Sequence, residues 1–221
     1  MKLNTNSNVY TIVYATIVVI VVAVLLALAH MGLKDTQDEK VKLDQQKQML
    51  VALRYDLKNC PNPAATYEEL VVDTLQMTED NEKANIIRFH LPDGATKYVL
   101  RLHGAGLWGG IGGYIAMDED KNTIYGINFN HESETPGLGA LIVEEPFRKQ
   151  FEGKQIRNEA GKMVSIAVMK QGKTCEAGEK YQVDAVSGAT ITSTGVSDML
   201  HENLCTEYAD FLKVEPKTEE E

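Results

Sequence analysis

The chain has 221 residues, of which 43% are hydrophobic and 24% charged, and its formal net charge at pH 7 is -10. This size and composition allow one sizeable hydrophobic core with at most a small second lobe, and they exclude an intrinsically disordered protein. The acidic balance, with lysines and arginines scattered along the chain, argues against a nucleic-acid partner. The three cysteines form no CxxC pair, which argues against a zinc site or an iron–sulfur cluster and leaves one disulfide plus a free thiol open. They are Cys60, Cys175 and Cys205.

The first feature along the chain is an uncharged apolar stretch at residues 9–29. At a rise of roughly 1.5 Å per residue, a helix of this length spans a hydrocarbon core of about 30 Å. The alternative is a cleaved signal peptide, because residues 27–29 read Ala-Leu-Ala, but the stretch is longer than an ordinary signal core. We therefore predict a retained transmembrane helix, preceded by an N-terminal cytoplasmic tail at 1–8. The lysines on its two sides do not decide its orientation.

A polar helix is predicted next, over residues 34–58, which contain no glycine or proline. We assign residues 30–62 to a juxtamembrane helical linker that the Pro-Asn-Pro sequence ends. Thr66 and Glu69 then have the spacing of a capping box, so a second helix is expected to start at Thr66. The apolar residues that share one face of the linker helix are Val41, Met49, Leu50 and Leu53.

From Asn85 the pattern changes to short segments rich in β-branched and aromatic residues, separated by turn sequences. Consecutive strands with short turns, with helices before and after them, predict an α+β domain with an antiparallel sheet. We place this domain at 63–213, followed by a solvated acidic tail at 214–221. The predicted strands cover 85–91, 96–103 and 123–132, with turns at 92–94 and 118–122 and a glycine-rich stretch at 104–117.

The glycine-rich stretch begins with GAGLWGGIGGY, at 104–114. It lacks the strand-GxGxxG-helix unit and the P-loop, so a dinucleotide or nucleoside-triphosphate site is unsupported. So many glycines indicate a close backbone approach, either to another strand or to a flat ligand. Trp108 is the only tryptophan, and such a residue fills a core more often than it stacks on a cofactor.

A turn is predicted where residues 131–139 read HESETPGLG, because Pro136 and Gly137 suit the two central positions of a type II turn. Such a turn can present backbone amides and the side chains of Glu134 or Thr135 to a ligand. A single histidine without a spaced partner is more often structural than catalytic, which is how we interpret His131.

The stretch DAVSGATITSTGV at 184–196 precedes a helix that the apolar spacing predicts to begin near Ser193 or Thr194. Thr190 would then lie just before a helix N-terminus, where free amides and the helix dipole favour a phosphate. A hydrolytic nucleophile is disfavoured, because no GxSxG elbow is present. A second Gly-Ala-Thr, ending at Thr96, is explained by a hairpin turn.

The chain resembles the FMN-binding domain family in the order of its motifs. These are an apolar anchor, GLWGG followed by IGGYIA, HESETPGLG and DAVSGATITS. Within it, the chain is most similar to the C subunits of the sodium-translocating NADH:quinone oxidoreductases, with the G subunits of the Rnf-type complexes as near relatives. In that family the threonine of Ser-Gly-Ala-Thr carries FMN through a phosphoester bond, installed by a flavin transferase that recognises an upstream aspartate.

The resemblance therefore implies covalent FMN on Thr190, and it excludes Thr96, which no serine precedes at the required position. The rest of the attachment motif is Asp184, Ser187, Gly188 and Ala189. The residues expected to line the flavin are Glu134, Thr135, Leu138 and Gly139, with Trp108 nearby. The GGIGG sequence after Trp108 departs from the family pattern and puts that wall of the site in doubt.

The function implied by the resemblance is an electron relay between redox centres during NADH oxidation and quinone reduction coupled to Na⁺ export. The protein is not catalytic alone, has no catalytic or metal-binding residue, and works with the other subunits of the complex. Its globular domain is expected on the periplasmic side of the inner membrane, held by a single pass. Two alternatives are an Rnf-type protein serving ferredoxin and NAD, and an anchored FMN-binding sensor or assembly module. The plainest alternative is an anchored scaffold whose Thr190 lies in a polar loop.

Overall fold

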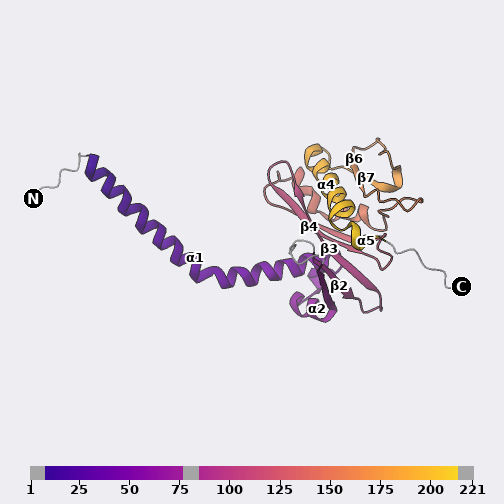
Figure 1. The fold of residues 1–221 in the computed structure, drawn as a ribbon, viewed down its shortest axis with the longest axis horizontal. Coiled ribbons are helices and arrows are strands. Elements are labelled where there is room, and N and C mark those ends of the chain that lie inside the picture. Colours follow the sequence, from indigo (N-terminus) through magenta and orange to yellow (C-terminus); the bar gives the residue numbers. More distant parts are fainter. Residues whose placement is uncertain (1–7, 77–84, 214–221) are drawn as a thin grey trace, which may run out of the picture. The chain divides into compact units, whose positions relative to one another are not determined.

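The computed structural model describes residues 8–76 and 85–213 (Figure 1). Most of the predicted N-terminal tail (1–8) and the whole of the predicted acidic tail (214–221) lie outside these residues. The chain divides into two compact units, residues 1–44 and 45–221.

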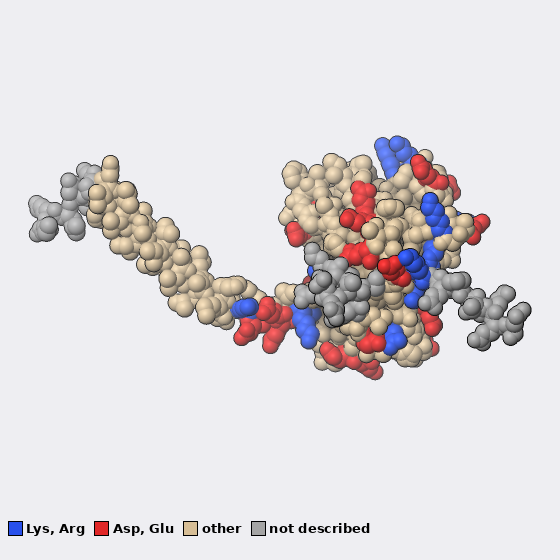
Figure 2. All heavy atoms as spheres, in the orientation of Figure 1, with Lys and Arg blue, Asp and Glu red and all other residues tan. Residues whose placement is uncertain are grey.

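The first unit consists of the N-terminal part of helix α1 (Asn8–Ala52). By length and composition α1 can cross a membrane, with a mean hydropathy of 3.1 over its most apolar window. The apolar side chains of this part are exposed, and its beginning carries none of the blue or red that marks charged residues in Figure 2. These features are those expected of a lipid-facing helix at residues 9–29.

The second unit includes the end of α1, which the sequence assigns to a linker. The helix ends at Ala52, before the expected end at Lys58, in a Schellman motif: the amide of Tyr55 donates to the Leu50 carbonyl and that of Arg54 to Val51. Arg54 takes the left-handed conformation, with φ of 63°. This end of the helix is buried in the domain, through Gln46, Met49, Leu50, Ala52 and Leu53.

Helix α2 (Pro63–Leu70) begins earlier than its capping-box pattern predicts. Asn62 is the N-cap, and its side chain accepts a hydrogen bond from the Ala65 amide at 3.3 Å. Thr66 lies within the helix and donates its hydroxyl to the Asn62 carbonyl. The predicted start was wrong because Pro63 occupies the first helical position, where its missing amide costs nothing.

A five-stranded antiparallel sheet in the order β1-β2-β3-β4-β5 confirms the predicted α+β fold. The hairpin pattern is confirmed, because each predicted strand pairs with its neighbour in sequence, whereas β1 carried no recognised strand signal. The strands are β1 (Val71–Gln76), β2 (Asn85–His90), β3 (Thr96–Ala105), β4 (Gly110–Met117) and β5 (Ile124–His131).

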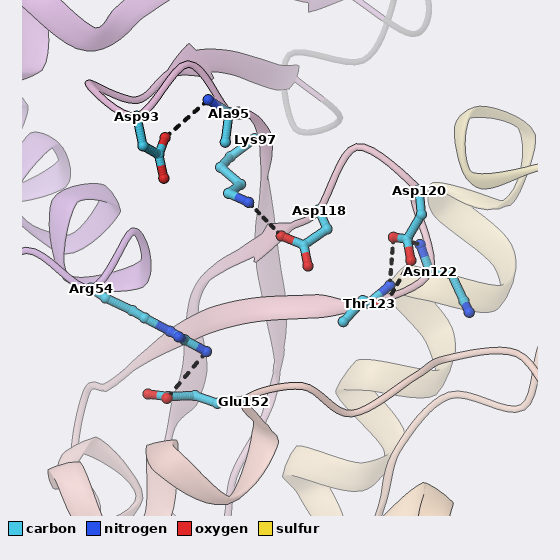
Figure 3. Close-up of polar contacts among 9 residues, drawn as sticks. All are labelled: Arg54, Asp93, Ala95, Lys97, Asp118, Asp120, Asn122, Thr123 and Glu152. Carbon is cyan, nitrogen blue, oxygen red and sulfur yellow. Dashed lines mark hydrogen bonds and ion pairs between the residues drawn. The ribbon is translucent and has the colours of Figure 1, made fainter.

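The two predicted turns are present, and aspartates stabilise both (Figure 3). Asp93 accepts a hydrogen bond from the Ala95 amide at 2.9 Å between β2 and β3. Between β4 and β5, Asp120 accepts hydrogen bonds from the amides of Asn122 and Thr123 and from the Thr123 hydroxyl. These contacts with the backbone are what short polar side chains do in tight turns.

Helices cover both faces of the sheet (Figure 1), so successive residues of the central strands are buried on opposite sides. Val99 and Ala116 face the core formed with the end of α1 and with α2, whereas Leu100 and Ile115 face the larger core formed with α4 (Thr190–Glu202). Just after the end of α1, Arg54 forms an ion pair with Glu152 at 3.2 Å (Figure 3).

The remaining elements are short. Strands β6 (Ala167–Met169) and β7 (Gln182–Asp184) form a small parallel sheet, which makes the fold a mixed one. The three cysteines all lie in the described part of the chain, and none is in a disulfide. The other helices are α3 (Glu145–Arg148), α5 (Ala209–Leu212), a π-helix at Asn203–Glu207, and 3-10 helices at Leu57–Asn59, Gly139–Val143, Lys149–Phe151 and Glu179–Tyr181.

Candidate functional site

Helix α4 begins at Thr190, earlier than the expected start near Ser193 or Thr194. The Ser193 amide donates to the Ala189 carbonyl, and the Ser193 hydroxyl accepts a hydrogen bond from the Val186 amide at 3.2 Å. The predicted start was wrong because the first turn is fixed by polar contacts with the preceding loop. Apolar spacing identifies only the later turns.

Thr190 is therefore the first residue of the helix rather than a residue before it. Its side chain is exposed, and no other described residue hydrogen-bonds to its hydroxyl. The first amides of a helix have no partner within the helix, and the dipole favours an anion at this end. The hydroxyl is thus accessible at a place where an attached phosphate is electrostatically favoured.

The loop before Thr190 has small side chains and requires glycine at one position. Ser187 and Gly188 are exposed, whereas Ala189 is buried. Gly188 has φ of 78°, a left-handed conformation that other residues rarely adopt. Asp184, at the end of β7, is also exposed, and its backbone is held by hydrogen bonds with the side chain of Gln150.

The predicted type II turn is confirmed. The Thr135 carbonyl accepts hydrogen bonds from the amides of Leu138 and Ala140, both at 3.1 Å, and Gly137 has φ of 76°. The side chains of Thr135 and Leu138 are exposed, whereas Gly139 is buried. The turn thus presents both of these side chains at the surface.

Glu134, which the sequence analysis expects to line the flavin, is buried, with only 4% of its surface exposed. One carboxylate oxygen, Oε1, accepts hydrogen bonds from the amides of Leu107 at 2.7 Å and Trp108 at 3.0 Å. The other, Oε2, accepts a hydrogen bond from the Thr192 hydroxyl at 2.6 Å. The carboxylate thus joins the glycine-rich loop, the type II turn and α4, three segments that are far apart in sequence.

Burial alone would raise the pKa of the Glu134 carboxyl, but the hydrogen bonds outweigh it. The Thr192 hydroxyl and the amides of Trp108 and Leu107 stabilise the charged form, and the net result is a pKa below the ordinary value. Glu134 is therefore ionised at neutral pH. His131 has a structural contact in the same turn, because its Nδ1 accepts a hydrogen bond from the Glu134 amide at 3.3 Å.

The glycine-rich stretch serves mainly for close approach of strands and helix. A Cβ at Gly112 or Gly113 would collide with the backbone of the neighbouring strands, and one at Gly104 would collide with Met199 of α4. Of the two open interpretations, approach to another backbone explains these positions. The GGIGG departure from the family pattern thus covers Gly109 and the start of β4.

Trp108 does not fill the core, since 66% of its surface is exposed. Ile191, next to the candidate attachment residue, is 60% exposed, and Leu138 is 41% exposed. The three side chains come from the three segments that Glu134 joins. Exposed apolar side chains of this kind are suited to a flat, largely apolar ring such as isoalloxazine.

The second Gly-Ala-Thr ends at Thr96, which is the first residue of β3. Thr96 pairs with His90 of β2, so it lies in a hairpin. Sequence reasoning missed Thr192 and Ser193, the two buried hydroxyls that hold the start of α4. A signal was present in the run ATITST, where every hydroxyl residue can be on either face. Only the position of the helix start assigns Thr190 to the exposed face and Thr192 to the buried one.

The comparisons with known proteins all indicate the same family. A family model described as the FMN-binding domain matches residues 106–204, which include all three motifs. The C subunit of the Na(+)-translocating NADH-quinone reductase of Vibrio vulnificus is 29% identical over 214 residues, covering 80% of this chain and 83% of the relative. The corresponding protein of Haemophilus ducreyi is 29% identical over 235 residues, with 89% and 90% covered.

Two solved structures are also similar. The crystal structure of the C subunit of the Na(+)-translocating NADH-quinone reductase from Parabacteroides distasonis superposes with a TM-score of 0.75 at 35% identity, covering 83% of this chain and 98% of that one. The corresponding protein of Shewanella oneidensis gives a TM-score of 0.52 at 30% identity, with 65% and 68% covered.

Proposed function

Since the chain belongs to the family of the C subunits of the Na(+)-translocating NADH-quinone reductases, we propose that it is the FMN-carrying subunit of such a membrane complex. The observation that carries this proposal is the position of Thr190. It is the first residue of α4, and its exposed hydroxyl lies near the type II turn and three exposed apolar side chains. An FMN cofactor supplies reversible electron transfer, and the protein supplies its position and surroundings.

The attachment is a phosphoester on Thr190, formed by a flavin transferase with flavin adenine dinucleotide as donor. A bond forms between Thr190 Oγ1 and the phosphorus of the flavin half, the bond to the bridging oxygen breaks, and adenosine monophosphate leaves with that oxygen. The hydroxyl proton passes to a base or to solvent, and no electrons change hands. Asp184, exposed upstream of Thr190, is the residue we assign to recognition by the transferase.

The residues of this chain then have separate tasks. The free amides at the start of α4 hold the phosphate, and Ser187, Gly188 and Ala189 leave room for it. Thr135, Leu138 and Trp108 contact the ring, and Gly139 allows the turn to lie close to α4. Tethering through the phosphate leaves the ring free to exchange electrons with neighbouring redox centres of the complex.

The protein relays electrons and has no NADH or quinone site of its own. We assign the membrane span to residues 9–29 of α1 and the globular domain to the periplasmic side of the inner membrane. Outside the cytoplasm a lost flavin has no ready replacement, which favours a covalent bond. A reporter enzyme active only in the periplasm, fused after the last residue, tests this orientation; an inactive fusion would contradict it.

The named relatives are all C subunits, which favours this complex over the Rnf-type alternative and over a sensor or assembly module. The test of the attachment is an SDS gel viewed under ultraviolet light after co-expression with a flavin transferase. We expect a fluorescent band that disappears in Thr190→Val and persists in Thr96→Val. A dark wild-type band would overturn the proposal.

A further inference from the structure

We propose that Glu134 is a positioning residue, whose buried carboxylate fixes the direction in which Thr190 presents its hydroxyl for flavin attachment. The inference rests on the proposed function, because it concerns the same attachment residue. It replaces the expectation that Glu134 lines the flavin, and it gives Thr192 a role as the link between the two.

The Glu134 carboxylate is engaged by the protein through both of its oxygens. Oε1 accepts hydrogen bonds from the amides of Leu107 and Trp108, and Oε2 accepts one from the Thr192 hydroxyl. Hydrogen bonds to an ionised acceptor are roughly twice as strong as those between neutral groups. Only 4% of Glu134 is exposed, so solvent does not compete for these contacts.

Two glycines form the space that holds the carboxylate. A Cβ at Gly106 would overlap Oε1, and a Cβ at Gly139 would overlap Oε2 and lie 2.6 Å from the Thr192 hydroxyl. Neither glycine has a positive φ, so backbone conformation does not require glycine at either position. Their common feature is the absence of a side chain next to Glu134, which indicates a site built around this carboxylate.

The geometry of a helix transmits this constraint to Thr190. Residues two apart are separated by about 200° around the axis, so they face opposite directions. Thr192 is 1% exposed and bound to Glu134, and Thr190 is consequently exposed. Rotation of the first turn would break the 2.6 Å hydrogen bond between Thr192 and Glu134 and turn the Thr190 hydroxyl away from its outward direction.

A second contact fixes the loop that precedes Thr190. The Ser193 hydroxyl accepts a hydrogen bond from the Val186 amide at 3.2 Å, and Ser193 follows Thr192 directly. Both contacts therefore act on the same turn, one from the side of Glu134 and one from the side of the loop. Because attachment requires Thr190 Oγ1 in line with the leaving group, a displacement of about 1 Å can slow it by about a hundredfold.

The test is the initial rate of flavin attachment to the full-length chain in detergent. Protein expressed without flavin is incubated with purified transferase and flavin adenine dinucleotide, and in-gel fluorescence is followed with time. The variants are Thr192→Val, which removes the hydroxyl at nearly constant volume, Thr192→Ser, which restores it, and Glu134→Gln. Ser197→Ala is the control. Ser197 is also on α4, but its hydroxyl accepts a hydrogen bond from the Val168 amide of β6, away from Glu134.

We expect Thr192→Val and Glu134→Gln to slow attachment by about tenfold or more, and Thr192→Ser and Ser197→Ala to stay within about twofold of the wild type. Circular dichroism reports whether each variant is folded, and Glu134→Gln decides the matter if Thr192→Val does not fold. Wild-type rates in both Thr192→Val and Glu134→Gln would overturn the inference, as would an equal loss in Thr192→Ser.

The same experiment separates this inference from the proposed function. A wild-type chain that takes up no flavin, or a Thr190→Val chain that does, contradicts the proposed function itself. Attachment at Thr190 with wild-type rates in the Thr192 and Glu134 variants contradicts only the positioning role of Glu134.

Discussion

Gly188 lies directly against Leu138: a Cβ on Gly188 would stand 2.9 Å from Leu138 Cδ2. Gly188 also has φ of 78°, a backbone conformation that favours glycine, and a side chain added there would have to move Leu138. The contact joins the loop that carries Thr190 to the type II turn. The attachment residue and the residues assigned to the flavin ring are thus held together by a contact between the two motifs themselves.

The first prediction follows from this contact. Gly188→Ala should destabilise the domain by about 1–2 kcal/mol through backbone strain alone and should also reduce covalent flavin, because the added methyl displaces Leu138. Thermal unfolding and in-gel fluorescence measure the two effects. Gly172→Ala is the matched control, since Gly172 has φ of 81° and no atom within 4 Å of a built Cβ. Loss of flavin in both variants would contradict a specific role for the contact.

The second prediction concerns the charge on Glu134. Its pKa is lower in the folded protein than the ordinary 4.5, so its contribution to stability is complete above that value and is lost as the pH falls through the folded pKa. The difference in unfolding free energy between wild type and Glu134→Gln should therefore shrink below about pH 4.5. Urea unfolding at several pH values measures it. A difference that stays constant down to about pH 3 would show that Glu134 is not held ionised.

A third prediction concerns Asn203, which is fully buried after α4. Its Nδ2 donates to the carbonyls of His103 and Met199, both at 2.9 Å, and its Oδ1 accepts a hydrogen bond from the His103 amide. Asn203→Ala leaves the His103 amide and carbonyl of β3 without these partners, at a cost of about 1–3 kcal/mol for each buried group, whereas the Met199 carbonyl keeps its bond from the backbone amide of residue 203.

The measurement is the thermal unfolding midpoint of the full-length chain in detergent. Asn59→Ala serves as the control, because Asn59 is exposed and its side chain donates to Asp56. We expect a clear drop only for Asn203→Ala. Equal midpoints for the two variants would show that Asn203 does not tie β3 to α4.

The fourth prediction addresses the electron relay. In the assembled complex, Thr190→Val should abolish quinone reduction by NADH, while NADH oxidation by an artificial acceptor persists, because we propose that NADH reacts at another subunit. Thr190→Ser keeps a hydroxyl and should retain part of the activity. Quinone absorbance followed in the purified complex gives the result, and a stained gel of the same sample verifies that every subunit is present. Wild-type quinone reduction by a Thr190→Val complex that lacks this flavin would rule out an obligatory relay.

The sequence predicts the strands well because their signals are local. β-Branched and aromatic runs separated by aspartate and glycine turns mark β2 to β5, and Pro136 with Gly137 marks the type II turn. The starts of α2 and α4 are mispredicted for a different reason. Each is fixed by a capping or polar contact, through Asn62 and Ser193, that apolar spacing does not register.

The site is predicted only in part for the same physical reason. Motif order predicts Thr190 as the attachment residue, and it groups Glu134 with the turn residues that are expected to line the flavin. That Glu134 is buried, and that Thr192 donates to it, depends on contacts between segments far apart in sequence. Asn203 is a further example, because its partner His103 is a hundred positions away and no periodicity connects them.

Covalent flavin on Thr190 is tested most directly by peptide mass spectrometry of the full-length protein, purified from cells that contain the flavin transferase. We expect the peptide carrying Thr190 to gain the mass of FMN minus water, with fragment ions that place the increment on Thr190 itself. An unmodified Thr190 peptide in a protein that nevertheless retains flavin after denaturation, or an increment on another residue, would contradict this assignment.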